Sequence, residues 1–173
     1  MSTATPLRER REAVVREHME SENRHEFDVT LGTFGHPRYE IIPTGDVFDG
    51  PDEVMAYFDE TRTAFPDQRN TLIALYQADD EIIVEFDLMG THLGAFRGLP
   101  ATGRAFTNRT LAIFAFAPDT DRIICERVYF DSAAILRQLG IAHDPLTLRG
   151  RIATVLNHPV TIGRALGRMV LAR

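Results

Sequence analysis

Lysine is absent from this chain, because all 19 basic side chains are arginine. A chain without lysine has no side-chain primary amine, so Schiff-base chemistry and lysine-bound pyridoxal phosphate are excluded. Serine occurs only at Ser2, Ser21 and Ser132. None of them lies in a Gly-x-Ser-x-Gly sequence, which excludes a serine hydrolase of the nucleophile-elbow type.

Cysteine and long apolar runs are scarce as well. The single Cys125 cannot form an internal disulfide, which is typical of a reducing compartment. No stretch approaches 18 uninterrupted apolar residues, so no transmembrane helix is expected. The first 18 residues become charged at once and lack the apolar core of a signal peptide. Together these features predict a cytoplasmic protein.

Motifs for cofactors and metals are also missing. Neither a Walker A sequence nor Gly-x-Gly-x-x-Gly occurs. The six histidines show no His-x-His or His-x₃-His spacing, and one cysteine cannot build a thiolate zinc site. The sequence therefore predicts a protein with no cofactor and no metal.

Charge is distributed unevenly along the chain. Residues 145–173 contain five arginines and no carboxylate, so the net charge of −6 divides into +5 for this segment and −11 for residues 1–144. General nucleic-acid binding depends on neutralising phosphates, which an acidic body cannot do. We therefore expect no nucleic-acid partner.

The pattern of apolar residues changes period along the chain. A charged amphipathic helix is expected at 7–23, and a second helix begins at Gly50-Pro51 and ends near Pro66. A short strand at 39–42 separates them. Four longer strands follow, and then Asp131-Ser132 starts a short helix that stops at Gly140. The long strands are expected at residues 70–78, 82–92, 105–117 and 123–130. Helices followed by a run of antiparallel strands predict an α+β fold.

Two stretches carry a resemblance to a known family. Residues 90–104 read GTHLGAFRGLPATGR, and residues 122–140 read RIICERVYFDSAAILRQLG. A weaker third stretch is HPRYEIIPTG at 36–45. In this order they resemble the SnoaL-like polyketide cyclases (ester cyclases) of the NTF2-like superfamily. The resemblance implies a cone-shaped, curved antiparallel sheet with packed helices, a central pocket and a homodimer.

The sequence departs from the family at two functional positions. The polyketide cyclases place an acid/base on the last strand, three residues before the aspartate that precedes the final helix, where this chain has Val128. Ketosteroid isomerases carry their aspartate base at the position of Ile42. Neither valine nor isoleucine transfers a proton, so neither constellation carries over intact.

The catalytic candidates are therefore His92 and Glu126. His92 ends a strand in the Gly-Thr-His-Leu-Gly segment and is either a pocket donor or base or a residue that ties the following loop. Glu126 alternates with Val128 and Phe130 and shares their face. If that face is concave, burial raises the proton affinity of Glu126; otherwise it pairs with an arginine such as Arg109 or Arg127.

Five further residues are ligand-binding candidates, each with a structural alternative. His36 stands at the pocket mouth or is a solvated loop residue, and Tyr57 lies on the buried side of its helix. Asn108 orients a ligand or bonds across strands. Tyr129 is a phenolic donor or an interface residue, and Asp131 is a ligand contact or the helix cap.

Residues 1–140 are predicted to form the NTF2-like domain, and residues 141–173 a helical extension packed on the same domain. The extension is expected to form two short helices broken at His158-Pro159. Its basic amphipathic pattern also suits an anionic membrane, but five arginines are few, and a membrane partner is considered unlikely.

The function expected is that of a cyclase or isomerase without a cofactor. It acts on an apolar polyketide-like or steroid-like carbonyl compound by proton transfer and enolate stabilisation. A non-catalytic small-molecule binding protein is the alternative, and Val128 and Ile42 favour it. Hydrolysis of an epoxide or ester, with a water held between Glu126 and Asn108, is the third hypothesis.

Overall fold

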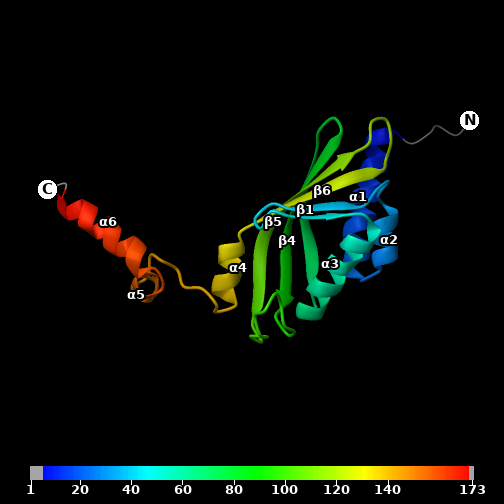
Figure 1. Ribbon diagram of the computed structural model, residues 1–173. Coiled ribbons are helices and arrows are strands. Elements are labelled where there is room, and N and C mark those ends of the chain that lie inside the picture. Colours follow the sequence, from blue (N-terminus) through cyan, green and yellow to red (C-terminus); the bar gives the residue numbers. More distant parts are fainter. Residues whose placement is uncertain (1–5, 172–173) are drawn as a thin grey trace, which may run out of the picture.

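A curved six-stranded sheet organises the computed structural model, which describes residues 6–171 (Figure 1). Its strands are β1 (Arg38–Ile41), β2 (Asp46–Asp49), β3 (Arg69–Gln77), β4 (Glu81–Thr91), β5 (Ala105–Phe116) and β6 (Ile123–Phe130). The described helices are α1 (Leu7–Asn23), α2 (Phe27–Gly32), α3 (Pro51–Ala64), α4 (Ser132–Gln138), α5 (Leu148–Asn157) and α6 (Pro159–Leu171). This is the predicted α+β fold, and the arrangement is NTF2-like.

The sheet has the order β2-β1-β6-β5-β4-β3. Strands β3 to β6 form an antiparallel meander, whereas β1 pairs in parallel with β6, opposing Tyr39 to Glu126. Alternation along the strands sends one set of side chains to the concave face. On β6 this set contains Glu126 and Val128, both buried.

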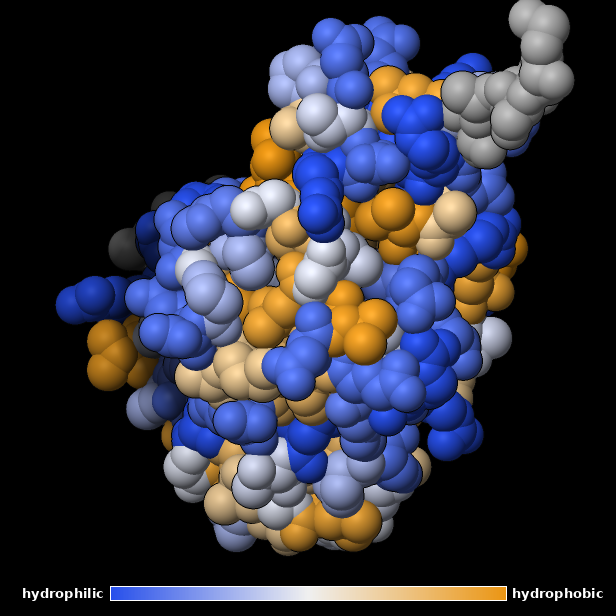
Figure 2. Space-filling view, turned by 90° about the vertical axis from the view of Figure 1, so that its right-hand side faces the viewer, coloured by the Kyte–Doolittle hydropathy of each residue, from blue (hydrophilic) through white to orange (hydrophobic). Residues whose placement is uncertain are grey.

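Helices α1, α2 and α3 gather on one side of the sheet (Figure 1). The core between them and the concave face contains Val15 and Met19 of α1 and Val54 and Phe58 of α3. Figure 2 shows the outer surface of this helical side, where hydrophilic residues predominate and apolar residues appear in smaller groups. The concave face is therefore covered along the helices and left open at one end.

Arg11 ties the start of α1 to the turns at one end of the sheet. Its guanidinium donates to the carbonyl oxygens of Thr120, Asp79 and Ala117 at 2.7, 2.9 and 3.1 Å, and to Asp80 Oδ1 at 3.0 Å. The side chain is buried and lies over the Phe116 ring. These bonds satisfy carbonyl groups of two connections at once, which holds α1 in register with the sheet.

Sequence reasoning located most elements within about one residue, and it missed two. The helix expected at 7–23 and the strand at 123–130 have the predicted bounds. The missed elements are α2, which spans only six residues, and β2. The sequence of β2 is Asp-Val-Phe-Asp, which is too short and too charged at its ends to give a clear strand pattern. The strand forms because it pairs with β1.

The C-terminal helices α5 and α6 contact each other and stand away from the sheet (Figure 1). They flank His158-Pro159 as expected. Among residues 6–171 no substantial contact joins them to the domain. The expected packing of residues 141–173 on the same domain therefore stays a prediction. No helix in the described range is long and apolar enough to cross a membrane.

Candidate functional site

A largely apolar cavity of about 330 Å³ occupies the open end of the sheet. Its volume lies in the range of small-molecule sites. Apolar side chains from β1, β4, β5, β6, α4 and the 94–104 loop line most of it. The lining residues are Ile41, Thr44, Asp46, Tyr57, Thr61, Phe65, Gln68, Leu88, His92, Phe96, Arg97, Leu99, Phe106, Phe130, Ser132, Ile135, Leu136 and Leu139.

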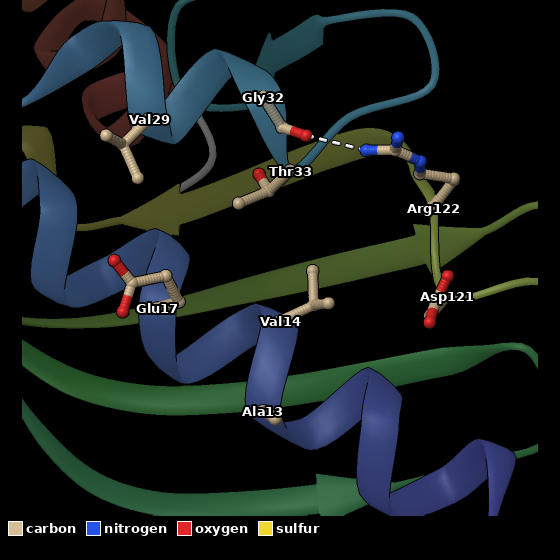
Figure 3. A pocket seen from close by; sticks show the side chains of 8 residues that line it. All are labelled: Ala13, Val14, Glu17, Val29, Gly32, Thr33, Asp121 and Arg122. Atoms are coloured by element: carbon tan, nitrogen blue, oxygen red, sulfur yellow. Dashed lines mark hydrogen bonds between the residues drawn. The ribbon is translucent and has the colours of Figure 1, made fainter.

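Two larger hollows of about 670 Å³ each lie on the two sides of α1. Figure 3 shows the first, a shallow surface groove between α1, α2 and the turn before β6. Its one guanidinium, that of Arg122, already donates to the carbonyl oxygen of Gly32 at 2.7 Å. Both are open surface depressions, so the enclosed apolar cavity is the better candidate for a ligand site.

His92 is the polar group that the cavity leaves without a partner. The ring is fully buried and stacks on Phe65, with centroids 5.1 Å apart. Its Nδ1 accepts from the backbone N–H of Thr102 at 3.3 Å and lies 3.2 Å from the Thr102 hydroxyl. An Nδ1 that accepts leaves the proton of the neutral ring on Nε2. Among the described residues Nε2 has no hydrogen-bond partner, so it is a buried donor that the protein itself leaves unsatisfied.

A short hairpin turn closes part of the cavity mouth. Phe96 and Leu99 pair across Arg97-Gly98, and both line the cavity. Arg97 and Gly98 have φ of 46° and 83°. Both values are left-handed, as a two-residue type I′ hairpin turn requires at its two central positions. Arg97 Nη1 lies 2.6 Å from Asp46 Oδ2, which links the turn to the start of β2.

A second polar group lies deeper, behind the cavity. His18 and Glu22 are one helical turn apart on α1, and they face Tyr39 of β1 and Glu126 of β6. His18 Nε2 lies 2.8 Å from the Tyr39 hydroxyl and 3.1 Å from Glu126 Oε2. The contact with Glu126 is close but not aligned as a hydrogen bond. Tyr39 donates to Glu22 Oε1 at 2.9 Å.

The hydrogen bonds around His18 fix where its protons lie. The Thr33 hydroxyl donates to the carbonyl oxygen of Thr30 at 2.6 Å, so it accepts from His18 Nδ1–H at 2.9 Å. Because Tyr39 gives its only proton to Glu22, its oxygen accepts from His18 Nε2–H. His18 therefore carries both protons as an imidazolium.

The pKa shifts of this buried cluster agree with that assignment. Burial lowers the pKa of His18, but the neighbouring Glu126 and Glu22 outweigh it and raise the pKa to about 9. Burial raises the pKa of Glu22, and the His18 imidazolium outweighs this, so the net shift is downward. For Glu126 burial prevails and the pKa is raised. The cluster thus pairs the His18 imidazolium with the Glu22 carboxylate, beside Glu126, whose carboxylate binds a proton more tightly than that of a solvated glutamate.

The same three side chains are the one group within residues 6–171 that could offer ligand atoms to a metal. His18, Glu22 and Glu126 each place one such atom within 4.8 Å of the others. The Tyr39 hydroxyl lies between His18 Nε2 and Glu22 Oε1, at 2.8 and 2.9 Å, where an ion would have to sit. The geometry therefore fits a hydrogen-bonded proton network better than a metal centre.

The structure separates the two catalytic candidates. His92 lines the cavity, whereas Glu126 faces the concave interior and pairs with His18 behind the cavity. The alternative pairing of Glu126 with an arginine is wrong. Arg109 pairs with Glu85 and Asp87, and Arg127 pairs with Glu81, all on the convex face.

The ligand-binding candidates are spread over the domain, and only Tyr57 lines the cavity. His36 is exposed, with Nε2 2.6 Å from Asp49 Oδ1. Asn108 is buried and donates to the carbonyl oxygen of Asp131 at 2.9 Å. Tyr129 points to the convex face, and Asp131 caps α4 by accepting from Ala134 N–H at 2.9 Å. Sequence reasoning missed His18, Glu22 and Tyr39, although His18 and Glu22 follow the helical spacing of the buried Val15.

Comparison with known proteins supports the fold and the family. The family model described as SnoaL-like polyketide cyclase matches residues 12–139. No curated protein matches the chain significantly. A structure from Jannaschia sp., provisionally assigned as a SnoaL-like polyketide cyclase, is 18% identical with a TM-score of 0.71, covering 83% of this chain and all of that one.

Two other solved structures show the same fold. TsrD from Streptomyces laurentii is 22% identical with a TM-score of 0.67, covering 79% of this chain and 99% of that one. A protein from Catenulispora acidiphila with a ketosteroid isomerase-like fold, bound to trimethylamine, is 16% identical with a TM-score of 0.64. The match covers 74% of this chain and 92% of that one. At these identities the likeness concerns the fold alone.

Proposed function

This chain belongs to the SnoaL-like polyketide cyclase family, and from that premise we propose that it is a cyclase or isomerase of an apolar polyketide-like or steroid-like carbonyl compound. The reaction takes a proton from the carbon next to the carbonyl and stabilises the resulting enolate. Both tasks need only a donor for the oxygen and a group that accepts and returns the proton. No cofactor is part of this proposal.

The unpartnered Nε2–H of His92 carries the proposal. A fully buried donor without a partner in a largely apolar cavity favours a carbonyl group, since a ligand without a hydrogen-bond acceptor would leave that donor unsatisfied. The enolate oxygen accepts more strongly than the carbonyl, so this donor stabilises the transition state more than the substrate. His92 acts here as a donor, not as a base.

Glu126 is the proposed final acceptor of the proton, which a bound water carries to it because Glu126 does not itself line the cavity. It lies behind the cavity wall: Tyr57 lines the cavity, and its ring centroid is 5.8 Å from that of Tyr39, which faces Glu126 across β1 and β6. Burial raises the pKa of Glu126 above that of a solvated glutamate, which makes its carboxylate a stronger base. The adjacent His18 imidazolium stabilises the carboxylate before it takes up the proton.

Hydrogen–deuterium exchange at carbon tests this mechanism. The probe is 2-tetralone, an apolar bicyclic ketone, incubated with the protein in D₂O and followed by proton NMR. We expect the wild type to accelerate exchange of the protons beside the carbonyl. Glu126→Gln should slow this by about 100-fold or more, and His92→Phe by about 100-fold because the oxygen loses its donor.

A matched control variant shows whether the effect depends on the cavity. His143 is an exposed histidine outside the cavity, and His143→Phe should exchange the ketone at the wild-type rate. Circular dichroism confirms that each variant is folded. If the folded wild type does not accelerate the exchange over buffer alone, the catalytic proposal is contradicted.

One observation favours a non-catalytic binding protein as the second candidate. Asp46 is the only carboxylate among the described cavity-lining residues, and it is already engaged by Arg97 and Thr44. A carrier binds the ketone with equal affinity in the wild type and in Glu126→Gln, and neither protein exchanges its protons. Calorimetric titration beside the exchange assay separates the two functions.

We also propose that the protein is a homodimer in the cytoplasm. The convex sheet face, which the described helices leave uncovered, exposes Leu111 and Tyr129 opposite each other on β5 and β6, and Ile124 near the start of β6 is exposed as well. Apolar side chains clustered on a sheet face suit an interface. Light scattering should give twice the 19.5 kDa mass of the chain, and a monomeric mass would contradict the dimer.

A further inference from the structure

The helices α5 and α6 expose an unusual amount of apolar surface. Leu148, Leu156, Met169 and Val170 are 76%, 73%, 65% and 75% exposed. Both helices lie beyond residue 139, where the family match ends, and stand away from the sheet (Figure 1). This surface is therefore an addition to the fold and is not used by the domain core.

Apolar and basic residues occupy opposite sides of α6. At 100° per residue Leu166, Met169 and Val170 share one side, and Arg164 and Arg168 lie on the other. Ile162 on the same side is half-buried, whereas Leu166, Met169 and Val170 are exposed. The helix therefore presents an apolar face with cations directed away from it.

Helix α5 also combines exposed apolar residues with arginines, but its arginines flank the apolar stripe. Its exposed apolar stripe contains Leu148, Ile152 and Val155. Arg149 and Arg151 flank the stripe on its two sides, where their charged ends can reach past the apolar surface. No aspartate or glutamate occurs from residue 145 to the end of the chain.

We propose that α5 and α6 form a binding surface for anionic phospholipid bilayers. The apolar sides insert at the level where headgroups meet acyl chains, and the arginines that flank the stripe of α5 bind lipid phosphates. The arginines of α6 lie above the headgroups and add to the attraction toward the anionic surface. Guanidinium groups suit phosphate because they donate two parallel hydrogen bonds to it. The sequence pattern alone made a membrane unlikely, and the separation of charge from apolar surface on two unpartnered helices changes that judgement.

A second copy of the chain fits this surface less well. Two such segments facing each other would bring Arg149 and Arg151 of one α5 close to those of the other, with no carboxylate between them. On the convex sheet face Glu81, Glu85 and Asp87 are already paired with Arg127 and Arg109. That face therefore offers few free carboxylates to the arginines of α5 and α6.

Vesicle co-sedimentation of the full-length protein tests the proposal. One set of vesicles contains phosphatidylcholine alone, and the other contains phosphatidylcholine and phosphatidylglycerol at three to one. We expect binding to the anionic vesicles at least about tenfold stronger than to the neutral ones, weakening with added salt.

Two double variants test the contributions of charge and of apolar contact to vesicle binding separately. Arg164→Gln with Arg168→Gln should weaken binding to anionic vesicles by about tenfold or more, and Leu166→Glu with Met169→Glu should abolish it. Arg16→Gln with Arg24→Gln removes the same charge from exposed sites on α1 and directly after it, and this variant should bind as the wild type does.

Three outcomes would overturn the proposal. One is equal or absent binding to the two kinds of vesicle, and another is binding that neither tail variant weakens. The third is a molecular mass in lipid-free solution that falls when Leu166 and Met169 are replaced, which would assign the surface to a second copy. The ketone exchange assay depends on the cavity, so its failure and the failure of lipid binding are distinguishable.

Discussion

Replacing His18 by leucine should lower the free energy of unfolding by about 3–5 kcal/mol at pH 7, the cost of removing one partner from a buried ion pair. His18 is fully buried, and its imidazolium is the cation that faces both Glu22 and Glu126. Leucine fills similar space but leaves the two carboxyl groups without a compensating charge. Urea denaturation followed by circular dichroism measures the effect.

Matched variants show whether charge is the cause. Adding Glu126→Gln to His18→Leu should restore part of the lost stability, because one carboxylate no longer lacks its partner. His143→Leu replaces an exposed histidine and should change stability by less than about 0.5 kcal/mol. A cost below about 1 kcal/mol for His18→Leu would contradict an imidazolium at this position.

Stability should also fall as the pH rises from neutrality to 9. Glu126 and Glu22 outweigh the effect of burial and raise the pKa of His18 from 6.5 to about 9. The folded state therefore holds this proton more tightly than the unfolded chain does. The resulting stability is fully present below pH 6.5 and is lost as the pH rises toward 9. The shift corresponds to about 3 kcal/mol.

The two glutamates change this profile in opposite directions. The raised pKa of Glu126 also favours the protonated folded state, so its contribution is lost as the pH rises above its unfolded value of 4.5. The lowered pKa of Glu22 contributes stability above 4.5, which is lost as the pH falls. We therefore expect maximal stability on the acid side of neutrality.

Urea titrations between pH 6 and 9 check this profile against a variant. His18→Gln keeps a polar side chain that cannot titrate, so its stability should vary much less over this range. Burial raises the pKa of the Cys125 thiol from 9.0 to about 11. The stability that this thiol contributes is therefore lost mainly above pH 9, outside the range of the titration. A wild type as flat as His18→Gln would refute the raised pKa.

Local patterns made most of the fold predictable. The alternation of apolar residues on β4 to β6 and the charged helix α1 have strong periods, which arise from neighbours along the chain. The parallel pairing of β1 with β6 was not predictable in this way. It joins residues about 87 positions apart, and no local pattern encodes such a pairing.

The candidate site was predictable only in part. His92 and Glu126 stood out as titratable residues on strands, and alternation placed Glu126 on the same face as Val128. Only the structure shows that this face is the buried, concave one. His18 and Tyr39 were missed because their role depends on α1 lying across β1 and β6. The helical spacing placed His18 beside Val15 and Met19, but a histidine among charged residues reads as solvent-exposed until its neighbours are known.

The position of β1 between β2 and β6 has a consequence for how the protein is made. Glu126 leaves the ribosome about a hundred residues after His18, on the order of ten seconds later at usual rates of synthesis. Until then β1 and β2 have no part of the main sheet to join, whereas β3, β4 and β5 can pair as they emerge and α1 can pack on β3 and β4. The β1-β2 hairpin is therefore the last part of the sheet to find its place, although it is made before the other four strands.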